Sequence, residues 1–239
     1  MSISGSRVLI VGGTSGIGLA VAAAVADRGA TPIVASRHPA SVETALAGLP
    51  AAAEGATVDL TDDASIAALL AQHGPFDHLA YTAGEPLELV PVSELTADVA
   101  RSFFQTRFLG AIAIVRAVAP ALRTGGSITL TSGTAADRPG AGWALAASVC
   151  GAMNALTRAL AIELAPLRVN AVAPGVVRTP LWSSMSEPDR NAMYDGVAAT
   201  VPLGRVAEVE DVALAYVYAM EQVHGTGIVI TVDGGTVLA

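Results

Sequence analysis

Lysine is missing from this 239-residue chain, and cysteine, aromatic residues and charged residues are all scarce. All 13 basic residues are arginine, they form no basic cluster, and the formal net charge is −8. Because nucleic-acid surfaces depend on concentrated lysine and arginine, we expect no nucleic-acid partner. The single cysteine, Cys150, excludes an internal disulfide framework, and the four histidines show no metal-ligand spacing, so no metal is expected.

Signals for membranes and secretion are also missing from the sequence. Every long apolar stretch is interrupted by Gly, Pro or a charged residue, so no membrane span is expected. The opening residues, MSISGSRVLIVGG, lack the basic start and cleavage signal of a secretory peptide. These absences predict a cytoplasmic protein that does not bind a membrane.

Apolar residues are abundant, at 52% of the chain, and allow 239 residues to bury a large core as one domain, 1–239. Continuous apolar runs, typical of buried parallel strands, alternate with stretches that have helical periodicity. The strands are expected at 7–11, 31–36, 56–59, 77–82, 127–131, 168–173 and 227–232. The main helices are expected at 17–28, 63–72, 98–122, 145–164 and 208–222, with a short one after Pro39. This alternation predicts an α/β fold, a Rossmann-type doubly wound parallel sheet of about seven strands with helices on both faces.

One long segment, about 177–205, breaks this alternation between a strand and the next helix. It is rich in Pro, Ser and Met, and loops of that length in compact domains are usually functional. We expect a substrate loop or lid here, and the alternative is a pair of short surface helices with no role.

A glycine-rich stretch, GGTSGIG, follows the first expected strand and opens directly into a helix. Glycines allow the backbone to turn tightly and approach a pyrophosphate, which the helix N-terminus stabilises through its free N–H groups and its dipole. The order strand, glycines, helix, strand makes this a strong dinucleotide signal. The expected contacts come from Gly12, Thr14, Ser15, Gly16, Ile17 and Gly18.

The end of the second expected strand indicates which dinucleotide is bound. An Asp or Glu there would bind the ribose hydroxyls of NAD, but the chain has Ser36 followed by Arg37. A hydroxyl and a guanidinium accept a 2′-phosphate through charge-assisted hydrogen bonds, so NADP(H) is favoured over NAD(H). The alternative is that Arg37 is only a solvated surface charge.

These residues, with several later motifs, resemble the short-chain dehydrogenase/reductase family over nearly the whole chain. The motifs are GGTSGIG, VDLTD, TAG at 82–84, RVNAVAPGVVRT and ITVDGG, in that order. The resemblance implies further contacts with the adenine, the ribose and the nicotinamide, from Asp59, Leu60, Ala83, Gly84, Pro174, Val176 and Thr179. It also implies a homodimer or homotetramer in which the helices at 98–122 and 145–164 pack against copies of themselves.

The same resemblance implies a catalytic set of Asn, Ser, Tyr and Lys, which this sequence does not carry. The stretch NALTRALAIELAPLRVNAVAPG fixes the register, in which Ala146 stands at the Tyr position and Cys150 at the Lys position. Arg107 stands at the Asn position, and the Ser position falls on Gly133, beside Ser132. No tyrosine lies between Tyr81 and Tyr194, and no lysine exists anywhere, so the standard Tyr-x-x-x-Lys mechanism is impossible.

Three residues are the candidates for a replacement catalytic group. Ser132 offers a hydroxyl that binds a substrate carbonyl, or else caps a turn. Arg107 offers a permanent cation that stabilises an alkoxide or fixes a carboxylate, or else forms a structural ion pair, for instance with Asp137. Tyr194 offers a phenol on the substrate loop.

The other possible groups are less favoured. Cys150 packs more readily as a small apolar residue than as an acid, and Tyr81 more readily packs a strand against a helix. Trp143 and Trp182 are expected to be pocket walls or oligomer contacts.

Two functions therefore stay open from the sequence. The first is an NADP-dependent oxidoreductase acting on a small carbonyl or hydroxyl compound, of unknown identity, with a non-standard proton donor. The second is a catalytically silent NADP(H)-binding scaffold or regulatory subunit.

Overall fold

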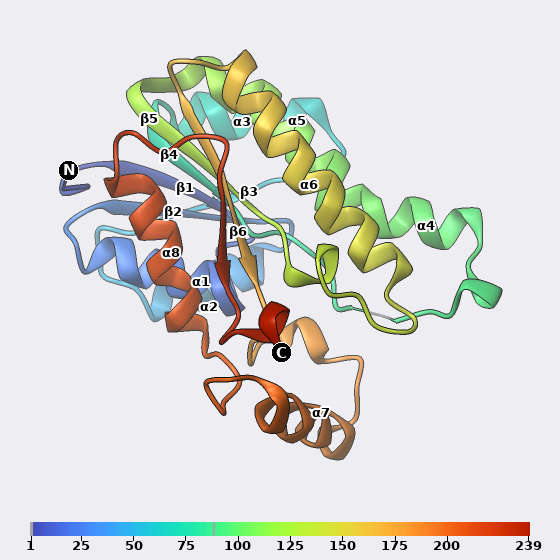
Figure 1. The fold of residues 1–239 in the computed structure, drawn as a ribbon. Helices are drawn as coiled ribbons and strands as arrows, with labels where there is room; N and C mark the ends of the chain where they lie inside the picture. Colours follow the sequence, from blue (N-terminus) through green and yellow to red (C-terminus); the bar gives the residue numbers. More distant parts are fainter. Residues whose placement is uncertain (1, 88) are drawn as a thin grey trace.

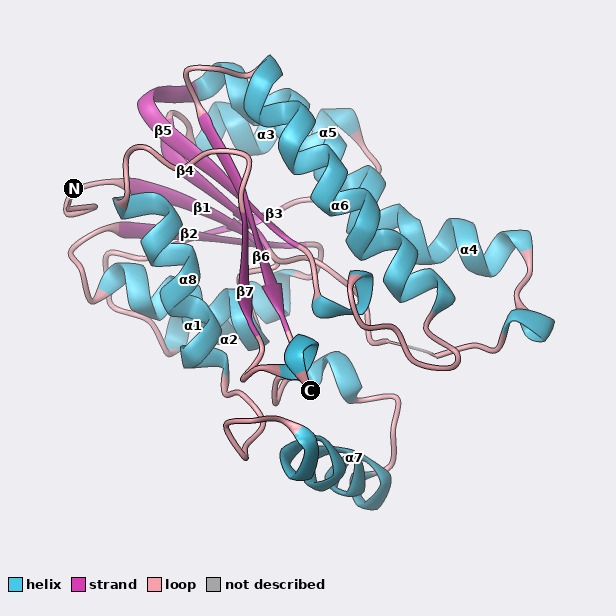
Figure 2. Cartoon of the chain, in the orientation of Figure 1, coloured by secondary structure: helices cyan, strands magenta, loops and turns pink. Residues whose placement is uncertain are grey.

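The computed structural model describes residues 2–87 and 89–239 and is built around one parallel sheet of seven strands (Figures 1 and 2). The strand order is β3-β2-β1-β4-β5-β6-β7, which is the predicted doubly wound arrangement. Every neighbouring pair is parallel. The strands are β1 (Arg7–Val11), β2 (Thr31–Ser36), β3 (Glu54–Thr57), β4 (Phe76–Tyr81), β5 (Leu122–Thr131), β6 (Arg168–Pro174) and β7 (Val229–Val232).

The central strands are apolar on both sides because helices cover both faces of the sheet. In β1, Leu9 and Val11 point into one buried cluster and Val8 and Ile10 into the other. The helices α3 (Asp63–His73), α5 (Ala111–Val118) and α6 (Ala144–Glu163) pack into the first cluster. The helices α1 (Gly16–Ala26), α2 (Pro39–Ala47) and α8 (Val209–Glu221) pack into the second.

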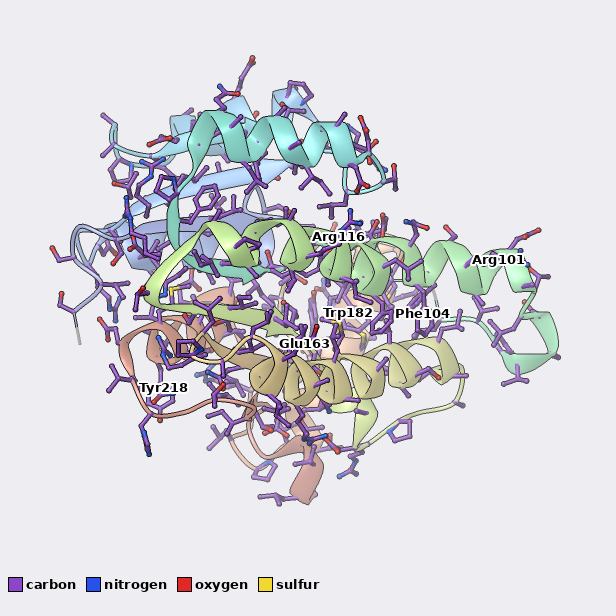
Figure 3. The ribbon with its side chains drawn as sticks, turned by 90° about the horizontal axis from the view of Figure 1, so that it is seen from above. Arg101, Phe104, Arg116, Glu163, Trp182 and Tyr218 are labelled. Carbon is purple, nitrogen blue, oxygen red and sulfur yellow. The ribbon has the colours of Figure 1, made fainter. Side chains whose placement is uncertain are left out.

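The helix predicted at 98–122 is interrupted in its middle. It consists of α4 (Ala97–Phe104), a π-helical segment at Gln105–Gly110, and α5. It lies beside α6 on the same side of the sheet, and Arg101, Phe104 and Arg116 mark its course in Figure 3. The π-helical segment carries Arg107, and such segments occur frequently at functional sites.

The prediction that no apolar run reaches the length of a membrane span is wrong, because two helical stretches have the length and the apolar composition of a span. The stretches Ala97–Ala121 and Ala144–Glu163 both reach that length, with mean hydropathies of 1.2 and 1.4. Gly110 and the arginines of the first stretch do not end the helical run, because the π-helical segment continues it. Each helix packs one face against the sheet, and helices of a folded core commonly meet the same criterion.

The segment at 177–205 contains helices, and its role as a substrate loop or lid stays a prediction. A 3₁₀ turn at Pro180–Trp182 is followed by α7 (Glu187–Thr200), which lies apart from the sheet (Figure 1). Ser186 caps α7 by accepting a hydrogen bond from the backbone N–H of Asp189, and Pro188 lies in its first turn. Proline and serine in this segment therefore begin a helix.

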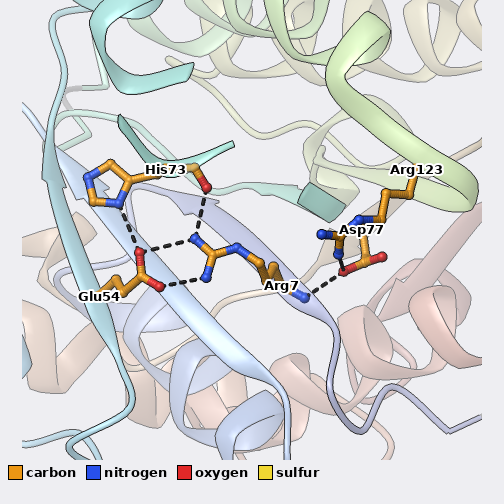
Figure 4. Close-up of polar contacts among 5 residues, drawn as sticks. All are labelled: Arg7, Glu54, His73, Asp77 and Arg123. Carbon is orange, nitrogen blue, oxygen red and sulfur yellow. Dashed lines mark hydrogen bonds and ion pairs between the residues drawn. The ribbon is translucent and has the colours of Figure 1, made fainter. Parts of the chain in front are cut away.

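A network of charged residues joins the amino ends of the strands, at the edge opposite the glycine-rich loop (Figure 4). Arg7 makes two hydrogen bonds to the carboxylate of Glu54, at 2.6 and 3.1 Å, and His73 Nδ1 lies 3.0 Å from the same carboxylate. Asp77 accepts hydrogen bonds from the backbone N–H of Arg7 and from the Arg123 guanidinium. This network ties β1, β3, α3, β4 and β5 together at the amino ends of the strands. The carboxyl ends of the strands are left free for a site.

Candidate functional site

A cavity of about 580 Å³ runs along the carboxyl ends of the strands, where open α/β sheets bind their ligands. Its walls come from the segments that follow β1 through β6. All of the residues that the sequence predicted as cofactor contacts line this one cavity: Gly12, Thr14, Ser15, Gly16, Ile17, Gly18, Ser36, Arg37, Asp59, Leu60, Ala83, Gly84, Pro174, Val176 and Thr179. Their contacts with a cofactor stay a prediction.

The glycine-rich loop provides a backbone cradle that larger residues would fill. Gly12 has φ of +84°, and a Cβ built on it would lie 2.6 Å from the backbone N of Ala83. A Cβ at Gly18 would lie 2.2 Å from the carbonyl oxygen of Gly12. Only glycine at both positions allows the loop to turn and the start of α1 to approach β4 this closely.

The N-terminus of α1 opens into the cavity as an unneutralised positive end. Ser15 precedes the helix but makes no capping hydrogen bond with its side chain, and the first turn has no acidic residue. The first N–H groups of a helix have no partners within it, so those of Gly16, Ile17 and Gly18 are available to an anion in the cavity that they line. The arrangement fits the pyrophosphate of a dinucleotide.

Arg37 is exposed at the rim of the cavity, next to half-buried Ser36 at the end of β2. Asp59, which follows β3, also lines the cavity. Its carboxylate accepts hydrogen bonds from the backbone N–H and the hydroxyl of Thr61. These hydrogen bonds hold the pKa of Asp59 below its usual range, and the charge of Arg37 adds to the effect. A guanidinium and a hydroxyl therefore face the space where a ribose phosphate would lie.

Ser132 lines the cavity beyond the end of β5, but its hydroxyl is already hydrogen-bonded. It donates to Oδ1 of Asn154 at 2.6 Å and lies 3.1 Å from the carbonyl oxygen of Cys150. The backbone N–H of Ser132 continues the sheet by donating to Val172. The hydroxyl therefore holds α6 against β5, and its free lone pair is what it offers the cavity.

Arg107 faces the cavity from the π-helical segment. Its guanidinium carbon lies 4.4 Å from the ring centroid of Phe103, and Nη2 donates to the carbonyl oxygen of Glu85. Nη1 lies 3.7 Å from the Glu85 carboxylate, so the ion pair forms with Glu85 and the suggested pairing with Asp137 is wrong. Glu85 lies in the segment after β4, four residues beyond Tyr81.

The two tyrosines that the sequence singled out occupy different places. Tyr194 is buried in a cluster with Trp182 and Ala146, beneath the guanidinium of Arg178, and it is not among the described residues that line the cavity. Tyr81 does line the cavity, but its hydroxyl donates to the carbonyl of Thr106. Burial raises the pKa of Tyr81 far above its usual range, so it keeps its proton.

The helix α6 presents Ala146 and Cys150 to the cavity, one turn apart. Burial raises the pKa of the Cys150 thiol to about 11, although the charge of Arg107 opposes the shift. Cys150 is thus a neutral, compact filler at neutral pH, as the sequence predicted.

Aromatic and apolar side chains form the walls at this end of the cavity. The rings of Trp143 and Trp182 lie 6.3 Å apart, and the Trp182 indole N–H donates to the carbonyl of Val177. Leu87 joins the loop after β4 to the 177–205 segment, because its N–H donates to Leu181 and its carbonyl accepts from Ser184. This end of the cavity, called the chamber below, is walled mainly by aromatic and apolar side chains, and its charged groups among the described residues are Arg107, Arg138 and Glu85.

Sequence reasoning missed three residues of the chamber. Glu85 follows the TAG motif immediately, and Phe103 lies four residues before Arg107, so spacing gave a weak signal for both. Arg138 also lines the cavity and donates to the carbonyl of Thr236 near the end of the chain, a contact across 98 residues that no local pattern predicts.

Comparisons with known proteins agree with this geometry. A family model described as enoyl-(acyl carrier protein) reductase matches residues 11–237. A short-chain dehydrogenase/reductase, ATR9 of Stachybotrys chlorohalonatus, is 38% identical over 253 residues, which cover 99% of both chains.

Solved structures with the same fold cover nearly the whole chain. A small-chain dehydrogenase in complex with NADPH is 34% identical with a TM-score of 0.85, over 98% of this chain and 99% of that one. The MalC reductase/Diels-Alderase of Malbranchea aurantiaca is 32% identical with a TM-score of 0.92, over 99% and 98%. An NADPH-bound short-chain oxidoreductase of Pseudomonas aeruginosa PAO1 with an atypical catalytic centre is 25% identical with a TM-score of 0.88, over 98% and 96%.

Proposed function

This chain belongs to the short-chain dehydrogenase/reductase family, and we propose that it is an NADP(H)-dependent oxidoreductase that acts on a small carbonyl or hydroxyl compound without a Tyr-Lys pair. One observation carries the proposal. A single cavity joins the glycine cradle at the start of α1 to the apolar chamber that holds Arg107 and Glu85. A dinucleotide held at one end therefore extends toward a compound held at the other.

The preference for NADP(H) is supported by the residues at the end of β2. Ser36 and Arg37 line the cavity where a carboxylate would repel a 2′-phosphate, and the guanidinium of Arg37 binds that phosphate. Two solved structures similar to this chain were obtained with NADPH. The helix N-terminus at Gly16 holds the pyrophosphate, and Val176 and Thr179 hold the carboxamide.

The proton that accompanies hydride transfer must come from a group other than the family's phenol. When bound, NADPH supplies a hydride from C4 of its nicotinamide to the substrate carbonyl carbon. The carbonyl oxygen then takes one proton to become a hydroxyl. Ala146 stands where the family's register places the tyrosine and has no proton to give. Cys150 stands where the register places the lysine, and burial makes its thiol a weaker acid than a free cysteine, with a pKa of about 11.

Arg107 is the residue best placed to assist this step. Its cation faces the chamber and stabilises the negative charge that develops on the substrate oxygen. A water molecule gives the proton and becomes hydroxide, which exchanges with the solvent. Ser132 contributes a hydrogen-bond acceptor, because its own proton is held by Asn154. Tyr194 shapes the 177–205 segment, which acts as the substrate loop, from its buried position.

The assembly is a homodimer or homotetramer, and the protein works in the cytoplasm without binding a membrane or nucleic acid. Apolar side chains stay exposed on the helices expected to meet a second copy: Val99, Leu109, Ile112 and Ile162. The Ile162 residue is 82% exposed on α6, and burying such residues against another copy supports the assembly.

A second function, an NADP(H)-binding scaffold without catalysis, is favoured by the missing lysine and by Ala146. A structure with NADPH bound separates the two functions. The oxidoreductase requires an ionisable side chain, for which we expect Arg107, within hydrogen-bond reach of the space above nicotinamide C4. If only Ala, Gly, Val and Cys side chains lie there, the oxidoreductase proposal is lost and the scaffold is retained.

A further inference from the structure

The chamber holds a buried arginine whose hydrogen-bonding capacity is mostly unused. The side chain of Arg107 is 13% exposed, and the ring of Phe103 and the carbonyl of Glu85 fix its position. A guanidinium has five N–H donors, and within residues 2–87 and 89–239 the recorded hydrogen bond of Arg107 is the one from Nη2. Unpaired donors of a buried cation are costly, so the remaining ones are available to a ligand oxygen.

The partner carboxylate neutralises this cation only in part. Nη1 of Arg107 lies 3.7 Å from Oε2 of Glu85, beyond hydrogen-bond distance, and Oε2 has no hydrogen-bond partner. The other oxygen of Glu85 accepts from the hydroxyl of Thr106. The side chain of Glu85 is 43% exposed as a whole, whereas Oε2, the oxygen that faces Arg107, is buried.

The sign of the local charge is opposite to that of the whole protein. Among the described residues that line the cavity beyond β4, β5 and β6, two are guanidinium groups, Arg107 and Arg138, and one is a carboxylate, Glu85. The whole chain carries a formal net charge of −8. Arg138 is exposed, so the buried cation of the chamber is the guanidinium of Arg107, and apolar walls strengthen its field on an anion.

The side chains of the chamber walls indicate what kind of molecule would carry such an anion. Trp143, Trp182, Phe103 and Leu87 give flat, apolar surfaces around the arginine. We propose that the chamber is an anion subsite, in which Arg107 binds an anionic oxygen, a carboxylate or an enolate, carried by an apolar ring. The inference rests on the proposed function in taking this chamber as the substrate end of the cavity.

The competing role for Arg107 is purely structural, holding the loop after β4 against the π-helical segment. The two roles predict different effects of removing the negative charge of Glu85 on the affinity for anions. In Glu85→Gln the hydrogen bond from Thr106 and the shape are kept, but the competing negative charge is lost. An anion subsite then binds anions more tightly, whereas a structural ion pair only loses stability.

The test measures binding of matched probes by calorimetry to the whole protein saturated with NADP⁺, with thermal midpoints recorded for each variant. Cyclohexanecarboxylate is compared with the neutral cyclohexanecarboxamide, and the enolate of cyclohexane-1,3-dione with its neutral methyl enol ether. We expect at least one anion to bind about tenfold or more tightly than its neutral partner. The arm with the larger ratio identifies the carboxylate or the enolate as the favoured ligand.

The variants assign that preference to Arg107. Arg107→Gln should reduce the ratio to within about twofold, and Glu85→Gln should raise it by about threefold or more. Arg116→Gln is the matched control because it removes an equally charged side chain from the exposed face of α5, and the ratio should stay unchanged. If Arg107→Gln does not fold, Arg107→Lys and Glu85→Gln still test whether Arg107 binds the anion. Lysine keeps the charge of arginine and loses its planar donor pair.

Two results would overturn the inference: equal binding of the anion and its neutral partner in both arms, or a preference that Glu85→Gln leaves unchanged or lowers. These results are distinguishable from failure of the proposed function, which is a failure of the wild type to bind NADP⁺ or NADPH in a separate titration. The probes are then titrated without nucleotide, and the same ratios apply.

Discussion

Gly18 lies so close to Gly12 that a Cβ at position 18 would be 2.2 Å from the Gly12 carbonyl oxygen. The same Cβ would be 2.5 Å from the hydroxyl of Thr82, so the first turn of α1, the glycine loop and the end of β4 meet at one point. A backbone carbonyl cannot move aside as a flexible side chain does. The geometry of the nucleotide cradle therefore depends on this glycine.

The first prediction is that Gly18→Ala greatly weakens NADPH binding, by about 100-fold or more, and lowers the thermal midpoint. The added methyl group pushes the start of α1 away from the loop and misaligns the N–H groups. Gly196→Ala is the control, because a Cβ there has open space in α7 and alanine favours a helix by up to about 1 kcal/mol. Equal NADPH affinity in the two variants would contradict the close packing.

The second prediction concerns which nicotinamide dinucleotide is bound. In Arg37→Ala the affinity for NADPH should fall by about tenfold or more, while that for NADH changes by less than about twofold. The reason is that only NADPH has a 2′-phosphate for the guanidinium at the end of β2. Fluorescence titration of both nucleotides measures this, with Arg101→Ala, an exposed arginine of α4, as the control. Unchanged NADPH binding in Arg37→Ala would remove Arg37 from the site.

The third prediction concerns acid stability and the network at the opposite edge of the sheet. Hydrogen bonds from Arg7 lower the pKa of Glu54 from 4.5 to about 2, aided by His73 and opposed by burial. Because the folded pKa is depressed, Glu54 stabilises the fold above the unfolded pKa and loses this contribution as pH falls from about 4.5 to about 2. Partial exposure of the pair makes the effect modest.

Chemical denaturation of wild type and Glu54→Gln between pH 7 and pH 2 checks this. The wild type should be more stable at pH 7, and the difference should close as the pH approaches 2. Asp98→Asn, which removes an exposed partner of Arg101, should leave both stability and its pH dependence unchanged. A difference between wild type and Glu54→Gln that is constant over the whole pH range would show that Glu54 does not titrate as proposed.

The fourth prediction is that Cys150 is chemically inert in the folded protein. With a pKa of about 11, about one thiol in a thousand is ionised at pH 8, against about one in four for a free cysteine. Alkylation by iodoacetamide should therefore be at least about 100-fold slower in the folded chain than in urea. The chain has a single cysteine, so intact mass measures the rate directly. Fast labelling of the folded protein would show that the Cys150 thiol is accessible and ionises readily, which would contradict its burial.

Much of the fold was predictable because local pattern and tertiary role coincide. All seven strands overlap the predicted runs, but β3 covers Glu54–Thr57 and not 56–59, and β5 begins at Leu122 and not at 127. The central strands fit best, since a strand covered on both faces must be apolar throughout. The glycine loop was predictable for the same kind of reason, because Gly12 requires a positive φ and Gly18 a close backbone approach. Both requirements are visible in the sequence as glycines at fixed spacing after a strand.

The chamber was less predictable because its contacts join distant segments. Arg107 appeared as an unusual cation in an apolar helix, but its partner Glu85 became visible only when β4 and the π-helical segment were placed together. The hydroxyl of Ser132 was recognised, while its bond to Asn154 depends on how α6 packs on β5. Polar partners of this kind are set by packing, which spacing along the chain does not encode.

Titration of the wild-type protein with NADPH, followed by tryptophan emission, tests directly whether the cavity binds a nicotinamide dinucleotide. The only two tryptophans, Trp143 and Trp182, both line the cavity, so a nicotinamide bound beside them should quench their emission and gain emission itself by energy transfer. We expect saturable quenching with one NADPH bound per chain, and NADPH should bind at least about tenfold more tightly than NADH. No quenching by either nucleotide would contradict it.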